Sequence, residues 1–222
     1  MKLYLDSADE RAWALPSACP PVQGVTTNPS LVHQAGLPVT LGSYERLLHA
    51  VAAQGMAELM LQLPRPDPVE ALAWQATLAE RASQLGVLLT LKLPCHPQWL
   101  PCIQALRQAG QAVLLTGMAN PVQLLWARAQ GAQFVAPYVG RLAADGRDIW
   151  SLMQACVAVQ SAGGPALLAA SIKSPEVLTR LIACGAAAAT LPPASLIAWS
   201  QDDITQTAMA QFDRDTLASQ AH

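Results

Sequence analysis

Short apolar runs recur along the chain and alternate with longer segments of helical spacing. The run at residues 2–6 reads KLYLD, and the run at 87–93 reads VLLTLKL. Runs of this length, bounded by turn residues, are typical of strands buried on both faces of a parallel sheet. The pattern predicts eight strands, at residues 2–6, 23–27, 58–63, 87–93, 112–116, 133–138, 166–170 and 187–191.

Several segments between these runs begin with proline and end near glycine. Helices are predicted over 68–85, 97–109, 121–129 and 175–183, each opening on a proline whose fixed φ suits the first helical turn. A glycine follows each helix and can adopt the left-handed conformation that ends it. These glycines are Gly86, Gly110, Gly131 and Gly185.

Repetition of this unit predicts an α/β fold, a single (β/α)8 TIM barrel in residues 1–200. A doubly wound open sheet is the competing arrangement, but no glycine-rich dinucleotide fingerprint follows the first strand. In the tail, residues 201–222, Ile204, Ala208 and Phe212 share a helical spacing. We expect an additional C-terminal helix there, docked on the barrel or on a neighbouring subunit.

The composition narrows the range of partners. A net charge of −2 provides no basic field for nucleic acid or an anionic membrane. No apolar run approaches the roughly 18 residues of a membrane span, and the acidic residues soon after Met1 do not fit a signal peptide, so we expect a cytoplasmic protein. With 52% hydrophobic and 13% charged residues, the chain is expected to bury surface between subunits. Five scattered cysteines without CxxC spacing indicate reduced thiols and no metal site.

One lysine interrupts an apolar strand. The chain has three lysines, Lys2, Lys92 and Lys173, and Lys92 lies within the run LLTLKLP. Lysine is almost never fully buried without a reason, and a lysine that points into a closed barrel loses its hydration. Its pKa then falls toward neutrality, which leaves a free amine that can attack a carbonyl and form a Schiff base. An outward lysine paired with an acid is the structural alternative.

Polar residues stand at the carboxyl ends of the other predicted strands, where barrel enzymes carry their chemistry. Tyr138 is the candidate acid/base, because a phenol near a cation can acquire a useful pKa, whereas the histidines fit this role poorly. Asp6 could bind a substrate hydroxyl or influence the protonation of the lysine. The amides of Asn28 and Gln62 could bind hydroxyl groups or position a water molecule. Thr27 and Thr116 also lie at strand ends.

Arg141, Ser171 and the segments after the last two strands form a further candidate site. The loops after strands seven and eight are the usual phosphate site of this barrel, where backbone N–H groups and an arginine contact phosphate oxygens. A phosphorylated sugar is therefore the expected substrate class.

Five motifs in this order carry a family resemblance: LYLDSAD at 3–9, GVTTNPSLV at 24–32, LKLP at 91–94, VAPYVGRL at 135–142 and LLAASIKSP at 167–175. They are similar to those of the transaldolase family, specifically its short fructose-6-phosphate aldolase-like branch. The resemblance implies a cofactor-free class I aldolase in which Lys92 forms the Schiff base, Tyr138 is the acid/base, and Arg141 and Ser171 hold phosphate. It places Asp6, Asn28 and Thr116 around the lysine, and implies a ring-shaped homo-oligomer joined by the C-terminal helix.

The resemblance also separates two reactions. Transaldolases resembling this chain carry glutamate at the position of Gln62, whereas the aldolase branch carries glutamine. We therefore expect reversible cleavage of fructose 6-phosphate into dihydroxyacetone and glyceraldehyde 3-phosphate, with transaldolase as the alternative and a non-catalytic sugar-phosphate-binding barrel as a second. The sequence departs from its relatives at 95–99 (CHPQW) and at Gly140, where asparagine is common.

Overall fold

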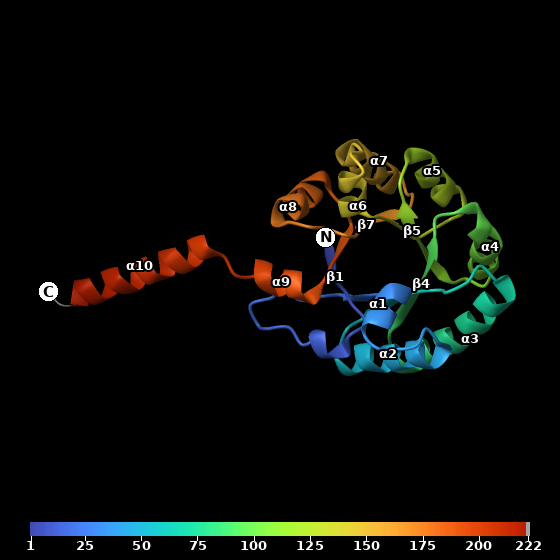
Figure 1. The fold of residues 1–222 in the computed structure, drawn as a ribbon, viewed down its shortest axis with the longest axis horizontal. Coiled ribbons are helices and arrows are strands. Elements are labelled where there is room, and N and C mark those ends of the chain that lie inside the picture. Colours follow the sequence, from blue (N-terminus) through green and yellow to red (C-terminus); the bar gives the residue numbers. More distant parts are fainter. Residues whose placement is uncertain (221–222) are drawn as a thin grey trace.

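The strands of this protein close into a barrel, with helices around it (Figure 1). The structure is a computed structural model and describes residues 1–220. All neighbouring strands are parallel and follow one another in chain order, and β1 closes the barrel by pairing with both β2 and β8. The strands are β1 (Lys2–Asp6), β2 (Gly24–Thr26), β3 (Glu58–Gln62), β4 (Leu88–Pro94), β5 (Ala112–Met118), β6 (Phe134–Pro137), β7 (Ala166–Ala169) and β8 (Ala188–Leu191).

The predicted barrel is confirmed, since each of the eight apolar runs coincides with one strand, and only β4 and β5 extend beyond their runs, by one and two residues. Ten α-helices lie within the described residues. They are α1 (Pro29–Gln34), α2 (Leu41–Ala53), α3 (Pro68–Leu85), α4 (Leu100–Gln108), α5 (Pro121–Ala129), α6 (Val139–Ala144), α7 (Ile149–Ser161), α8 (Pro175–Cys184), α9 (Pro193–Trp199) and α10 (Asp203–Gln220).

One predicted helix differs from the structure. The segment expected to be a continuous helix from Pro97 to Ala109 begins with a 3-10 turn, Pro97–Trp99, and only then becomes α4. Pro101 explains the break, because it has no N–H to donate to the carbonyl of Pro97. The backbone therefore makes a tight 3-10 turn immediately after β4, the strand that carries Lys92.

Strand residues alternate between two buried environments. Leu91 and Leu93 of β4 belong to the main core, which lies between the sheet and the helices. A separate apolar cluster comes from six strands, one residue each: Tyr4, Met60, Leu114, Ala136, Leu168 and Ala188. We call this cluster the barrel floor. In β1, β3 and β5, the next residue with the same orientation, two positions on, is polar.

The C-terminal helix α10 stands apart from the barrel and extends away from it beyond α9 (Figure 1). None of its residues is buried, and its apolar residues Ile204, Phe212 and Leu217 are 80%, 66% and 69% exposed. The expected additional helix is therefore present. No helix within the described residues is long and apolar enough to cross a membrane.

Candidate active site

A cavity of about 710 Å³ opens at the carboxyl ends of the strands. Its lining comes from β1, β3 and β4 and from the segments after β2, β6, β7 and β8. Seven of the nine predicted site residues line it: Asp6, Asn28, Gln62, Lys92, Tyr138, Arg141 and Ser171. The other two, Thr27 and Thr116, lie behind this lining and contact Lys92 and Tyr138.

Lys92 points into the barrel because β4 alternates its side chains. Its neighbours Leu91 and Leu93 are buried in the main core, so Lys92 faces the opposite side. The side chain is 6% exposed, and Nζ donates a hydrogen bond of 2.8 Å to the carbonyl oxygen of Thr27. Burial lowers the pKa of the amine to about 8, although the negative charge of Asp6 opposes this shift. Lys92 is thus a desolvated amine at the bottom of a cavity.

Thr26 of the neighbouring strand β2 fixes the position of the Asp6 carboxylate. The hydroxyl of Thr26 donates to Oδ1 of Asp6 at 2.9 Å, and the two residues are paired in the β1–β2 register. The carboxylate lines the cavity and acts electrostatically on Lys92. Asp6 therefore supplies a fixed negative charge next to the amine.

Tyr138 stands between β6 and α6, and its hydroxyl accepts a hydrogen bond of 2.9 Å from Thr116. The guanidinium of Arg141 lies 4.7 Å from the centre of its ring. The cation over the ring face helps to fix the position of the tyrosine side chain. Since Thr116 donates to it, the tyrosine oxygen keeps its own hydrogen for a ligand in the cavity.

Two of the amide side chains that line the cavity, those of Asn28 and Gln62, differ in their hydrogen bonds. The Oδ1 of Asn28 accepts from the backbone N–H of Leu31 at 3.1 Å and caps α1, which leaves the amide hydrogens of Asn28 for a ligand. The Oε1 of Gln62 is buried and has no hydrogen-bond partner within residues 1–220. A buried amide without a partner costs about 1–3 kcal/mol, so a hydroxyl group or water that donates to Gln62 is favoured here.

The loops after β6 and β7 meet at one end of the cavity. Ser171 adopts a left-handed backbone conformation with φ of 60°, and its carbonyl oxygen accepts from the N–H of Gly140 at 2.9 Å. A Cβ at position 140 would lie 2.4 Å from that oxygen and 2.8 Å from Cγ of Lys173, so the close contact of these loops requires glycine. The stem of Lys173 thus occupies the space above Gly140.

Lys173 and Arg141 are the two cationic residues that line this end, together with Ser171. Lys173 and Gln34 of α1 also line the cavity, and neither is among the nine predicted site residues. Lys173 could have been predicted from the sequence, because it lies two residues after Ser171 in the same loop. The contact of Gln34 depends on how α1 lies and has no such signal in the sequence.

The unusual segment after β4 does not line the cavity. His96 is exposed, and its Nδ1 accepts from the backbone N–H of Gln98 at 3.2 Å. Cys95 is buried, and burial raises the pKa of its thiol to about 11, so it remains protonated at neutral pH. Neither residue touches the cavity that holds Lys92.

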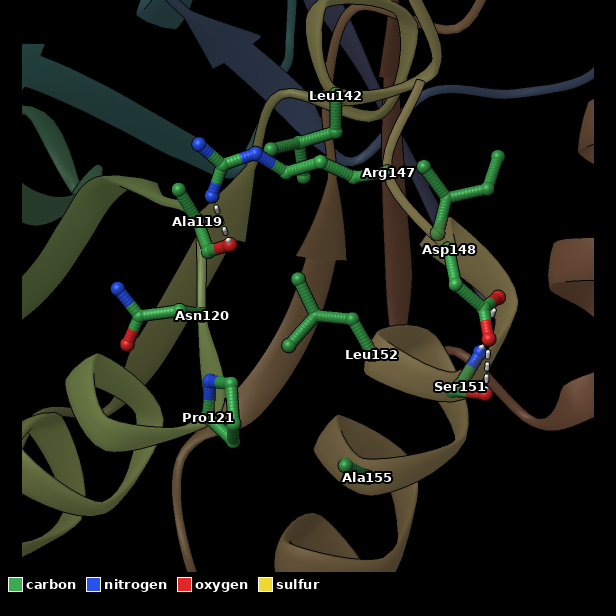
Figure 2. A pocket seen from close by; sticks show the side chains of 10 residues that line it. Ala119, Asn120, Pro121, Leu142, Arg147, Asp148, Ser151, Leu152 and Ala155 are labelled. Atoms are coloured by element: carbon green, nitrogen blue, oxygen red, sulfur yellow. Dashed lines mark hydrogen bonds between the residues drawn. The ribbon is translucent and has the colours of Figure 1, made fainter. Parts of the chain in front are cut away.

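A second cavity, of about 330 Å³, lies between the start of α5 and α7 (Figure 2). Apolar side chains such as Leu142 and Leu152 form much of its wall, and Arg147 crosses one side with a hydrogen bond of 3.3 Å to the carbonyl of Ala119. It contains no lysine and no hydroxyl pair like Thr116 and Tyr138. The arrangement that carbonyl chemistry requires is present in the larger cavity instead.

The described part of the chain contains no candidate metal site. Among residues 1–220, no three His, Cys, Asp or Glu side chains are grouped in a way that could hold a metal ion. The candidate site consists instead of an amine, a carboxylate, a phenol, three amides and two further cations.

Comparisons with known proteins show the family of this chain. Residues 3–222 match the family model described as transaldolase/fructose-6-phosphate aldolase. Curated relatives named "Probable transaldolase" include those of Dehalococcoides mccartyi, 29% identical over 218 residues, and Pelotomaculum thermopropionicum, 28% identical over 227 residues. The first alignment covers 97% of each chain, as does the second.

A solved structure supports the fold alone. It is described as "Native KDPGal structure", has a TM-score of 0.57 and 16% identity, and the match covers 89% of this chain and 92% of that one. The family match over nearly the whole sequence is the stronger result. The chain belongs to the transaldolase/fructose-6-phosphate aldolase family of enzymes.

Proposed function

We propose that this protein is a class I aldolase that reversibly cleaves fructose 6-phosphate into dihydroxyacetone and glyceraldehyde 3-phosphate. The observation that carries the proposal is Lys92, a buried amine whose pKa is lowered to about 8 and which faces a cavity of substrate size. The hydroxyl pair of Thr116 and Tyr138 supports it, because the reaction also needs an acid/base.

In the first step, the free amine of Lys92 attacks the ketone carbon of the open-chain sugar. Uptake of one proton from solvent and loss of the carbonyl oxygen as water give an iminium ion, with a new bond between Nζ and that carbon. Asp6 is placed to stabilise this positive charge, since its carboxylate acts on the same nitrogen. The amide of Gln62, whose oxygen has no partner within residues 1–220, can accept from a substrate hydroxyl or from the released water.

In the second step, Tyr138, once it has released its own proton to solvent, accepts the proton of the hydroxyl group on the fourth carbon. The bond between the third and fourth carbons breaks, its electron pair moves toward the iminium nitrogen, and glyceraldehyde 3-phosphate leaves. Tyr138 then returns the proton to the third carbon of the enamine. Water hydrolyses the resulting iminium, which releases dihydroxyacetone and one proton and restores the amine of Lys92.

The phosphate group is proposed to lie at the end of the cavity lined by Arg141, Ser171 and Lys173. Two cations there can neutralise a phosphate dianion, and the loops after the last strands of this barrel are its usual phosphate site. Asn28, on the opposite side of the barrel, has free amide hydrogens for a sugar hydroxyl.

Transaldolase, which passes the dihydroxyacetone unit to erythrose 4-phosphate, is the second candidate. The names of the curated relatives favour it. Gln62 favours the aldolase, because it has no charge with which to retain the iminium intermediate. A third candidate, a barrel that binds sugar phosphates without turnover, leaves the lowered pKa of Lys92 without a role.

Reductive trapping tests the proposal. The protein is incubated with dihydroxyacetone or fructose 6-phosphate, reduced with borohydride and mapped by peptide mass. An adduct of dihydroxyacetone mass on Lys92, together with release of free dihydroxyacetone from fructose 6-phosphate, is expected. An adduct with transfer to erythrose 4-phosphate but little release would support transaldolase, and no adduct on Lys92 would exclude both enzymes.

We also propose that the protein is a ring-type homo-oligomer joined through α10. The apolar residues of this helix are exposed in the single chain, and an isolated helix of this length gains little stability without a partner. Light scattering should show an oligomer for the full chain and a smaller species after truncation beyond Ser200. Phe212→Asp should weaken assembly in the same direction, whereas an unchanged mass in both variants would contradict this role.

A further inference from the structure

A chain of hydroxyl groups connects β8 to the carboxylate of Asp6. The Oγ1 of Thr190 lies 2.7 Å from the Oγ1 of Thr26, and Thr26 donates to Oδ1 of Asp6 at 2.9 Å. The three residues come from β8, β2 and β1, which are neighbours because the barrel closes. Closure therefore brings a residue near the C-terminus to a carboxylate near the N-terminus.

The direction of donation in this chain is fixed by the number of hydrogens. A hydroxyl has one hydrogen to donate, and the ionised carboxylate of Asp6 can only accept. Thr26 gives its hydrogen to Asp6, so the hydrogen between the two threonines must come from Thr190. Each donation strengthens the next, because an oxygen that accepts a hydrogen bond becomes a better donor.

Neither threonine is positioned to touch a substrate. Thr26 is fully buried and Thr190 is 2% exposed, and neither lines the cavity that contains Asp6 and Lys92. Any effect of Thr190 on the reaction must therefore pass through Thr26 to Asp6. A valine would have nearly the same shape but could not donate.

We propose that Thr190 is a positioning residue for catalysis, which holds Asp6 toward Lys92 through the hydroxyl of Thr26. The inference rests on the proposed function for its meaning in turnover. Independently of turnover, the Thr190 hydroxyl controls how strongly the negative charge of Asp6 acts on the amine of Lys92.

The other charged groups near Lys92 are not bonded to this chain. Arg141 and Lys173 line the cavity from the loops after β6 and β7. Glu58 of β3 accepts from Tyr4 and Thr90 in the barrel interior. Replacing Thr190 leaves all of these groups in place, so a change in the titration of Lys92 would report on Asp6.

The test compares Thr190→Val with Thr90→Val. Thr90 is a matched control, because it is also 2% exposed, also lies in the barrel interior and also donates to a carboxylate, that of Glu58, at 2.9 Å. Reductive methylation with formaldehyde, followed by peptide mapping, measures the pH midpoint at which Lys92 becomes reactive. This measurement does not depend on any sugar substrate.

In Thr190→Val we expect the pH midpoint of Lys92 to fall by about 0.5 pH unit. The Asp6 carboxylate raises the pKa of the amine, and this effect becomes weaker when Asp6 is no longer held in position through Thr26. The kcat for cleavage of fructose 6-phosphate should fall about tenfold with KM nearly unchanged, because the phosphate end of the cavity is untouched. Thr190→Ser, which keeps the donor, should restore both values, and Thr90→Val should change neither.

The inference is overturned if Thr190→Val and Thr90→Val have the same Lys92 midpoint as the unmodified protein. It is also overturned if Thr190→Ser behaves like Thr190→Val, because the methyl group and not the hydroxyl would then matter. Failure of the proposed function would look different. The unmodified protein would neither cleave nor form an adduct, while the Lys92 midpoint would still move in Thr190→Val.

Discussion

The barrel interior contains two levels that differ by two residues along each strand. Strand β1 contributes Tyr4 to the barrel floor and Asp6 to the cavity, and β3 contributes Met60 and Gln62 in the same way. On β5, Leu114 lies in the floor and Thr116 contacts Tyr138. The same strands therefore provide a packed level and a reactive level.

Polar groups at these two levels are satisfied to different degrees. In the lower part, the carboxylate of Glu58 accepts from Tyr4 at 2.7 Å and from Thr90 at 2.9 Å. In the upper part, Oε1 of Gln62 has no partner in the described chain, and the amine of Lys92 has lost its hydration. The lower level is built for stability, and the upper level leaves unsatisfied groups that a substrate can satisfy.

The largest contrast between the levels is expected from Lys92→Met. Turnover should fall by a factor on the order of 10⁴ or more, because no amine remains to form the Schiff base. The free energy of unfolding at pH 7 should rise by about 1–3 kcal/mol, since the protein no longer buries an ammonium group. Steady-state kinetics and urea denaturation measure the two effects, with Lys2→Met at the exposed start of β1 as the control.

The stability gain should depend on pH with a defined sign. The pKa of Lys92 is about 8 in the folded state and 10.5 as an unperturbed lysine, so the unfolded chain binds more protons between these values. Burial of the charge destabilises the folded protein fully below pH 8, and this cost disappears as the pH rises toward 10.5. An equal gain for Lys92→Met at pH 7 and pH 10 would contradict burial of a charged amine.

The next largest effect is expected from a pair of tyrosine substitutions, one at each level. Tyr138→Phe should lower kcat by about 10²–10³ and leave borohydride trapping on Lys92 intact, because it removes the acid/base and not the amine. Tyr4→Phe should lower the free energy of unfolding by about 1–3 kcal/mol with little effect on kcat, because Glu58 loses one donor.

Kinetics and thermal unfolding of both variants separate these roles. If Tyr4→Phe impaired turnover as strongly as Tyr138→Phe, the two levels would not be functionally distinct. If Tyr138→Phe kept full activity, the proton would have to be moved by another group, and the bond between Thr116 and Tyr138 would be structural.

A smaller effect is expected in the pH dependence of the amine. With a pKa of about 8, roughly a tenth of the Lys92 side chains are neutral at pH 7, against about 0.03% for an ordinary lysine. The rate of adduct formation with dihydroxyacetone should therefore rise about tenfold from pH 7 to pH 9 and then level off. A rate that continued to rise to pH 10.5 would show that the barrel does not desolvate Lys92.

The difference between the levels was partly predictable from the sequence. The apolar run LLTLKLP predicted that Lys92 is buried in the barrel, and the polar residues at the strand ends predicted most of the side chains that line the cavity. The contacts that tune these groups were not predictable. Thr116 donates to Tyr138 only because α6 begins directly after β6, and Thr190 reaches Thr26 only because β8 closes on β1. Such contacts depend on how separate elements meet in the folded barrel, which residue spacing does not describe.

The smallest effect is expected at Gln62, which lies beside Lys92 in the β3–β4 register. Gln62→Glu should raise the ratio of transfer to cleavage by about three- to tenfold, because a carboxylate there would stabilise the iminium and slow the release of dihydroxyacetone. Product analysis with and without erythrose 4-phosphate measures this ratio. Gln34→Glu is the matched control, because it makes the same change elsewhere in the same cavity. An equal rise in both variants would mean that general negative charge, and not the position beside the lysine, separates the two reactions.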